Sequence, residues 1–178
     1  REVTRPDEAA VRESAIESLA ENLNDSVVAP VFWFLLLGLP GAALYRFANT
    51  ADAMWGYRGA REGRVWDWAG KWAARADDVL SWLPARITAL LIAVARRGLP
   101  WTLLQSEAAR TPSPNSGWPM AAMALALDVR LGKPGAYVLN AAAGQPGADH
   151  AQRAQALASR AVGGLLLLSS AVLLAWTA

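Results

Sequence analysis

The chain has 178 residues, of which 54% are hydrophobic and only 18% are charged. Since a typical soluble domain is about 25% charged, this composition indicates a membrane protein. The net charge of +2, without a basic stripe interleaved with aromatic residues, argues against a nucleic-acid partner. The absence of cysteine excludes disulfides, zinc–thiolate sites and cysteine nucleophiles. The single histidine, His150, lies in a Gly/Pro/Ala-rich tract and is interpreted as an exposed linker residue rather than a member of a catalytic triad.

The first predicted element is a helix over residues 7–26. Its expected apolar face is a row at every fourth position, Val11, Ala15, Leu19, Leu23 and Val27. The opposite face carries an acidic row at the same spacing, Glu13, Glu17, Glu21 and Asp25. Because like charges four residues apart repel slightly, this row is either a plain solvated face or a site that binds a cation. The neighbouring amides of Asn22 and Asn24 favour a site.

Residues 27–48 form the first predicted membrane segment. The stretch from Ser26 to Tyr45 is uncharged, and its twenty residues reach about 30 Å as a helix, the thickness of a bilayer core. Pro and Gly residues interrupt the segment, and lipid cannot satisfy the backbone groups that such breaks release. The sequence GLPGA, Gly38 to Ala42, is therefore interpreted as a kink or a re-entrant turn between two half-helices.

Residues 49–81 form a polar excursion, and residues 79–98 a second apolar segment interrupted by Pro84 and Arg86. One helical face of the excursion carries apolar residues, Trp68, Trp72, Val79 and Trp82. Such a face predicts an amphipathic helix on the membrane surface. Asn49, Asp52 and Arg58 are not explained by that role. An arginine as deep as Arg86 needs a partner, for which the candidates are Asp78, Asp77 and Asp52.

The remaining segments complete the predicted fold. A turn from Ser113 to Gly117 precedes a short apolar helix that ends at Leu127, and it is either an anion-binding helix start or a capped loop. Residues 132–160 are expected to form a loose loop with a short polar helix over 148–160, and residues 161–178 a closing transmembrane helix. The fold class expected is all-α: a single polytopic membrane domain over residues 1–178, with broken or re-entrant helices and an amphipathic interfacial helix.

Four separated motifs occur in this order: ESLAENLNDSVVAP (Glu17 to Pro30), NTADAMWGYR (Asn49 to Arg58), ARADDVLSWLPARITALL (Ala74 to Leu91) and SPNSGWPMAAMA (Ser113 to Ala124). Their order and approximate spacing resemble the CobD/CbiB family of cobalamin biosynthesis, the adenosylcobinamide-phosphate synthases. The resemblance covers nearly the whole chain up to about Leu131. Family chains are longer at the N-terminus, so we expect this chain to be a C-terminal part of such a protein.

The resemblance implies a carbon–nitrogen ligase of the bacterial inner membrane. Such an enzyme joins the propionate carboxyl of adenosylcobyric acid to the amine of aminopropanol phosphate, or of the bare aminoalcohol. It implies ATP and Mg²⁺ as cofactors, a corrinoid as substrate, and other membrane proteins of cobalamin assembly as candidate partners. The family usually has Ser, Glu and Gly where this chain has Ala53, Met120 and Asp128, which excludes Ala53 and Met120 from catalysis.

The chemistry of amide formation selects the candidate site residues. The catalytic candidates are the carboxylates Glu17, Glu21, Asp25 and Asp52. The candidate Mg²⁺ ligands among them are Glu21, Asp25 and Asp52. The substrate-binding candidates are Asn22, Asn49, Tyr57, Arg58, Asp78, Arg86, Ser113, Asn115, Gly117 and Trp118, with Arg58, Arg86 and the Ser113–Gly117 turn expected to cradle the phosphate.

This hypothesis requires the acidic helix and the segment from Asn49 to Asp52 to meet at one membrane face. The break at Gly38 to Ala42 must then return the chain to the side from which it entered. The alternative is a non-catalytic membrane sensor or scaffold of the AmpE-like type. Retention of Asn49, Asp52 and the Ser113–Trp118 motif argues against that alternative.

Overall fold

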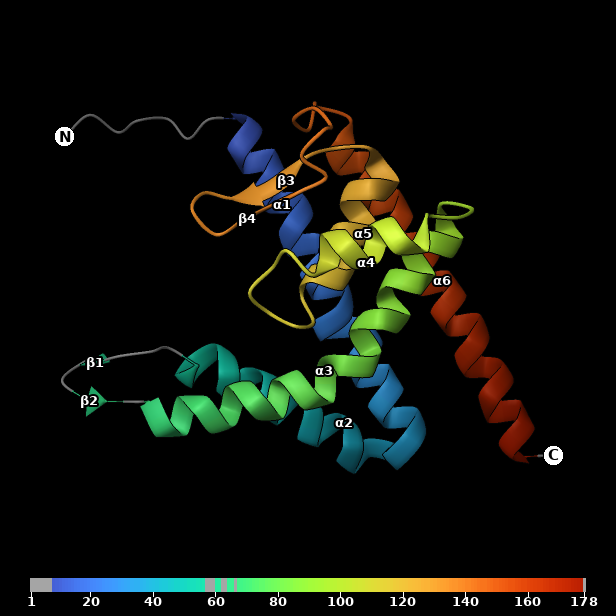
Figure 1. The fold of residues 1–178 in the computed structure, drawn as a ribbon. Coiled ribbons are helices and arrows are strands. Elements are labelled where there is room, and N and C mark those ends of the chain that lie inside the picture. The colour runs from blue at the N-terminus through green and yellow to red at the C-terminus, as the bar shows by residue number, and fades with distance from the viewer. Residues whose placement is uncertain (1–7, 57–59, 62–63, 66, 178) are drawn as a thin grey trace.

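The computed structural model describes residues 8–56, 60–61, 64–65 and 67–177, and it is built almost entirely of helices (Figure 1). In chain order the elements are α1 (Glu8–Asn22), the π-helix η1 (Leu23–Val28), α2 (Ala29–Trp55), β1 (Ala60–Arg61), β2 (Arg64–Val65), α3 (Asp67–Ala95), α4 (Trp101–Ala108), α5 (Gly117–Leu127), β3 (Leu131–Lys133), β4 (Tyr137–Leu139) and α6 (His150–Thr177). Two short antiparallel hairpins, β1–β2 and β3–β4, are the strand pairs of the described residues.

Three helical stretches within the described residues are long and apolar enough to cross a membrane: Glu8–Trp55, Gly70–Ala95 and His150–Trp176. Many large apolar side chains on these stretches face outward, for example Leu39 (73% exposed) and Leu167 (75% exposed). In water such exposure would be costly, whereas lipid is as apolar as these side chains. The protein is therefore an all-α polytopic membrane protein, as the sequence predicts.

Helix α5 lies at the centre of the packed part of the molecule. It is buried on almost every side, by α1, α3, α4 and α6, with Met120, Met123 and Leu127 nearly inaccessible. Small residues between these side chains let the neighbouring helices approach closely. The short apolar helix of the sequence analysis is thus a buried element rather than a membrane span.

The first helix differs from the prediction in which face it buries. Ile16, Ala20, Leu23 and Val28 are buried, whereas Val11, in the expected apolar row, is 51% exposed. The mismatch lies within α1, where the helical repeat of 3.6 residues makes a period-four row drift around the helix, so the buried face runs through Ile16, Ala20 and Leu23. The π-helix at Leu23–Val28 then adds a residue to one turn and rotates the residues after it relative to α1.

Helix α2 breaks where the sequence predicts. Gly38 has φ +68° and ψ −157°, a conformation essentially restricted to glycine, and Pro40 follows it. The second half of α2 then returns toward η1, so that Arg46 Nη1 donates to the Asp25 carbonyl oxygen at 3.0 Å. The first half stays beside α3, because Trp33 Nε1 donates to the Leu80 carbonyl oxygen at 3.0 Å.

Two predicted boundaries are wrong. The amphipathic helix and the second apolar segment form one continuous helix, α3, which contains Pro84 and changes direction along its length (Figure 1). Its expected surface stripe is exposed, with Trp68 at 78% and Trp72 at 71%. Residues 148–178 were expected as two helices, but α6 runs unbroken from His150 to Thr177. Gly163 and Gly164 lie inside α6 without ending it.

The predicted loose loop over residues 132–160 contains the β3–β4 hairpin and the first turns of α6. The base of the hairpin is fixed by a buried carboxylate, because the Asn140 backbone N–H donates to Glu107 Oε2 at 2.7 Å and Arg110 pairs with Glu107 Oε1 at 3.1 Å. Asp128, with φ +56°, ends α5 in the left-handed region that normally favours glycine. These ties hold the hairpin against the helices.

The Gly38→Ala substitution tests the return of α2. A side chain at this φ and ψ is strained by about 1–3 kcal/mol, so we expect a lower apparent unfolding temperature in detergent, followed by the fluorescence of the nine tryptophans. Gly163→Ala is the matched control, since a Cβ there meets nothing within 4 Å. Equal unfolding temperatures for the two variants would contradict the role assigned to Gly38.

Candidate active site

A chain of buried polar groups connects η1, α2 and α3. Tyr45 Oη lies 3.4 Å from Asp25 Oδ1 and 3.3 Å from Ser81 Oγ, and Ser81 Oγ lies 3.4 Å from Asp77 Oδ1. Tyr45 and Ser81 are almost fully buried. The two hydroxyls have two protons for these three contacts, so with both carboxylates ionised one of the three contacts has no proton at any moment.

Asn49 and Arg46, on the returning half of α2, complete this cluster. Asn49 Nδ2 donates to Asp77 Oδ1 at 3.1 Å, and the Asn49 amide also reaches Asp25. Arg46 Nη1 donates to Asn49 Oδ1 at 3.3 Å, which orients the amide so that its nitrogen faces the carboxylates. The Asp25 and Asp77 side chains are thus held in fixed orientations by donors from three elements.

The π-helix positions Asp25. Asn24 is 2% exposed, and its Nδ2 donates to Asp25 Oδ1 at 2.7 Å. The buried Thr88 hydroxyl of α3 lies 3.0 Å from Asn24 Oδ1 and 2.9 Å from the Pro84 carbonyl oxygen. The contact with the Pro84 carbonyl oxygen is a back-bond to the residue four positions earlier, which threonine commonly makes within helices. π-turns are frequent at functional sites because they redirect side chains in this way.

Asp52 and Asp78 lie at the edge of the cluster. Both are partly exposed, and Asp52 is close enough to Asp25, Asp77 and Asp78 for their charges to repel. This concentration of negative charge in apolar surroundings favours a bound cation. The structure thus brings Asp25, Asn49 and Asp52 into one neighbourhood, as the sequence predicts.

Arg86 has a different neighbourhood from the one predicted. No carboxylate among the described residues forms an ion pair with it; its guanidinium lies over the rings of Trp82 (4.1 Å) and Trp118 (4.8 Å). Its Nη1 donates to the Trp82 carbonyl oxygen and to Asn115 Oδ1. Aromatic faces and carbonyl oxygens thus take the place of the expected aspartate.

The Ser113–Gly117 turn joins α5 to α3. Asn115 Nδ2 donates to the Asp78 carbonyl oxygen at 2.7 Å, while the backbone N–H groups of Asn115 and Ser116 both donate to Ser113 Oγ at 3.2 Å. A Cβ at Gly117 would collide with the Ala108 carbonyl oxygen and the Thr111 hydroxyl. Because these N–H groups are already satisfied, the turn is suited to positioning α5 rather than to cradling a phosphate.

Glu17 and Glu21 face the β3–β4 hairpin. Tyr137 Oη donates to Glu17 Oε1 at 3.0 Å, and Lys133 is close enough for its charge to act on both glutamates. Burial and the neighbouring Glu17 carboxylate raise the pKa of Tyr137, so its hydroxyl stays protonated and donates. Glu21 also lies within range of the Asp25 charge and therefore connects this region to the buried cluster.

Three other predictions have separate outcomes. Asn22 lines a groove between η1 and α6 rather than the carboxylate cluster. Tyr57 and Arg58 lie outside the described residues. No three His, Asp or Glu side chains of the described part of the chain gather closely enough to hold a metal ion, so the trio Glu21, Asp25 and Asp52 does not form a metal site by itself.

Tyr45, Arg46, Asp77 and Ser81 are site residues that the sequence analysis did not assign. Two of them carry a local signal, since Tyr45 stands four residues before Asn49 and Ser81 stands four residues after Asp77, which places each pair on one helical face. Tyr45 also ends an uncharged stretch and was therefore counted as part of the span.

The helices and the buried polar cluster define an α-helical membrane protein with a carboxylate site between a returning half-helix and its neighbours. Comparison with known proteins identifies the family. The family described as CobD/Cbib protein matches residues 1–165, and the chain belongs to this family.

Curated relatives agree with this assignment. A probable cobalamin biosynthesis protein CobD of Methanothermobacter thermautotrophicus is 50% identical over 145 residues, covering 78% of this chain and 48% of the relative. The one from Pyrococcus abyssi is 51% identical over 140 residues, covering 77% and 44%. The cobalamin biosynthesis protein CobD of Rhodobacter capsulatus is 40% identical over 187 residues, covering 99% and 58%. The chain thus spans about half the length of these relatives, and no solved structure matches it.

Replacing Asn49 by leucine tests the cluster. The Asp77 carboxylate would lose its amide donor, which costs about 1–3 kcal/mol for a partly buried charged group, so we expect a lower apparent unfolding temperature. Thr50→Val is the isosteric control on the exposed neighbouring position. If both variants unfold at the wild-type temperature, the hydrogen bond between Asn49 and Asp77 does not hold α2 to α3.

Proposed function

We propose that this chain carries the reactive carboxylates of a membrane ligase that forms an amide between adenosylcobyric acid and aminopropanol phosphate or the bare aminoalcohol, giving adenosylcobinamide phosphate or adenosylcobinamide. The observation that carries the proposal is the convergence of Asp25, Asp77 and Asn49 from three separate elements. Family membership supports a role in cobalamin biosynthesis, and the three candidate spans support the cell membrane as its location.

The donor chemistry of the cluster fits Mg²⁺. This ion prefers carboxylate, carbonyl and water oxygens, and proteins usually hold it with one or two carboxylates together with the phosphates of a substrate. Asp25 and Asp77, with Asn49 between them, would therefore hold it, in place of the three-carboxylate set predicted from the sequence. ATP with Mg²⁺ would supply the activation that a carboxylate requires before an amine can attack it.

The protein's own groups have two roles in this proposal. An amine must lose its proton to act as a nucleophile, and Asp52 at the cluster edge is positioned to accept it at a carboxylate oxygen. The donors from Asn24, Tyr45, Asn49 and Ser81 fix the orientation of Asp25 and Asp77, so that little reorganisation accompanies the reaction. The surrounding apolar helices would limit the access of bulk water, which competes with the amine.

A cobinamide-forming assay with the full-length protein in detergent tests the proposal. We expect Asp25→Asn, Asp77→Asn and Asp52→Ala each to lower kcat/KM by about 100-fold or more, as for the loss of a group that acts directly in catalysis. Asp149→Asn is the matched control, because Asp149 is exposed beside the start of α6 and pairs there with His150 and Arg153.

Two outcomes would overturn the proposal. Wild-type activity in Asp25→Asn and Asp77→Asn would remove the cluster from catalysis. Failure of the full-length protein to restore cobinamide synthesis in a strain that lacks it would favour the sensor or scaffold instead.

A further inference from the structure

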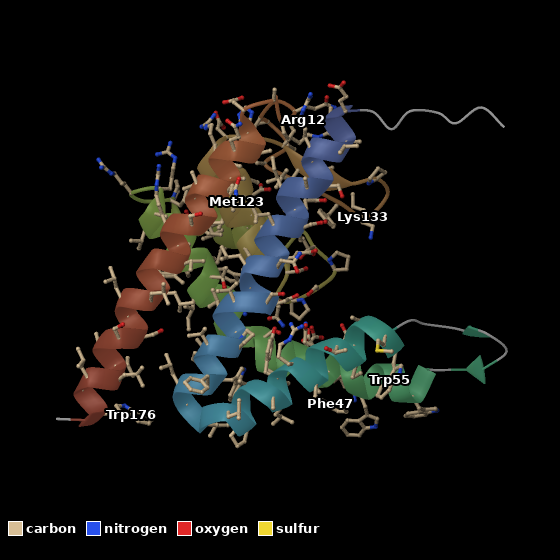
Figure 2. All side chains as sticks on the ribbon, turned by 180° about the vertical axis from the view of Figure 1, so that it is seen from behind. Arg12, Phe47, Trp55, Met123, Lys133 and Trp176 are labelled. Carbon is tan, nitrogen blue, oxygen red and sulfur yellow. The ribbon has the colours of Figure 1, made fainter. Side chains whose placement is uncertain are left out.

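A groove of about 350 Å³ lies between the acidic face of α1 and the β3–β4 hairpin. Its α1 wall carries Glu13, Glu17 and Glu21, and its hairpin wall carries Lys133 and Tyr137. Figure 2 shows Lys133 on the hairpin beside α1, on the same end of the molecule as Arg12. The groove therefore has carboxylates on one wall and a cation on the other.

The hairpin holds the side chains of Lys133 and Tyr137 next to each other. Lys133 and Tyr137 are paired across the strands, so their side chains leave the same face of the hairpin side by side. The turn between them contains Pro134 followed by Gly135 at φ +74°, and the Ala136 N–H donates to the Lys133 carbonyl oxygen at 2.9 Å. This is the geometry of a type II turn, which needs glycine at that position. Lys133 is thus presented by a rigid loop.

A second hollow of about 400 Å³ adjoins the groove and shares Glu13, Lys133 and Tyr137 with it. It is lined by Arg130 as well. Arg130 Nε and Glu13 Oε1 are buried and have no hydrogen-bond partner within the described residues. Buried polar atoms are rarely left unpaired in native structures, so both point to a polar molecule bound here.

We propose that this groove, together with the hollow that adjoins it at Lys133, binds the aminoalcohol phosphate, with its ammonium group on Glu17 and Glu21 and its phosphate on Lys133 and Arg130. This proposal rests on the proposed function and assigns a place to one of its substrates. A zwitterion of this size matches a groove with both signs of charge, whereas an anion alone would be repelled by the glutamates. Glu21 is within range of the charges of both Lys133 and Asp25, so an ammonium group held by Glu21 is at the end of the groove nearest the carboxylate cluster.

The assignment differs from the phosphate cradle predicted from the sequence. Arg86 is stacked between two tryptophans, and the N–H groups of the Ser113–Gly117 turn are already bonded. Lys133 is exposed, and its ammonium group forms no hydrogen bond or ion pair with other described residues. It is therefore the cation that a phosphate can engage without disrupting other contacts.

The test uses the chain's two lysines in the full-length protein. Lys133→Ala should raise the KM for aminopropanol phosphate by about 10- to 100-fold, the loss expected for one charged hydrogen bond, and leave the KM for unphosphorylated aminopropanol within about twofold. Lys133→Arg should restore most of the affinity for the phosphate. Lys71→Ala, an exposed lysine over the Trp68 ring, is the charge-matched control and should change neither KM.

Calorimetric binding of aminopropanol phosphate without ATP separates this inference from the proposed function. If the wild type binds the compound, Lys133→Ala does not, and no cobinamide forms, the ligase assignment fails while the groove stands. If the wild type forms product and Lys133→Ala has an unchanged KM, or loses both compounds equally, the groove assignment is overturned. Binding of inorganic phosphate as tightly as aminopropanol phosphate would also overturn it, because the glutamates would then play no part.

Discussion

The fold depends on keeping two aspartates, Asp25 and Asp77, side by side in an apolar region. Two carboxylates in such surroundings repel each other and lose hydration, so the arrangement persists only if neighbouring groups donate to both. Tyr45 donates to Asp25, while Ser81 and Asn49 donate to Asp77, so η1, α2 and α3 must all be brought to the same point. The break at Gly38, the π-turn at Leu23–Val28 and the buried contact of Thr88 all serve that convergence.

This view explains why the irregular parts of the chain are concentrated around the site. A straight helix through residues 29–55 would carry Asn49 about 35 Å from Asp25 instead of next to it. A regular α-helix through residues 23–28 would leave Asp25 in the outward acidic row with Glu17 and Glu21. The irregular backbone therefore converts one continuous row of acids into two neighbouring groups, one in the buried cluster and one facing the hairpin.

Much of this could be predicted from the sequence, and the exceptions have physical causes. The uncharged stretch before Tyr45 and the glycines and prolines in it predict a broken span, because composition and backbone constraints act locally. The buried face of α1 differs from the predicted row because a period-four pattern drifts around a helix of 3.6 residues per turn, and the π-turn that follows has no local signal. The role of Asp77 depends on a partner 28 residues away, Asn49, and no spacing rule predicts such a contact. The hairpin at Leu131–Leu139 was missed because its strands have only three residues each.

The unbroken α6 also determines how the molecule meets the bilayer. Its 28 residues extend about 42 Å, but only the uncharged part after Arg160 is suited to hydrocarbon, and that part covers about 25 Å. The first three turns, with Arg153 and Arg160, must then stand in the headgroups or beyond them. Since the hairpin precedes these turns and packs near α1, its groove opens at the aqueous surface. A small, charged, water-soluble compound can therefore reach this groove without crossing the hydrocarbon region of the bilayer.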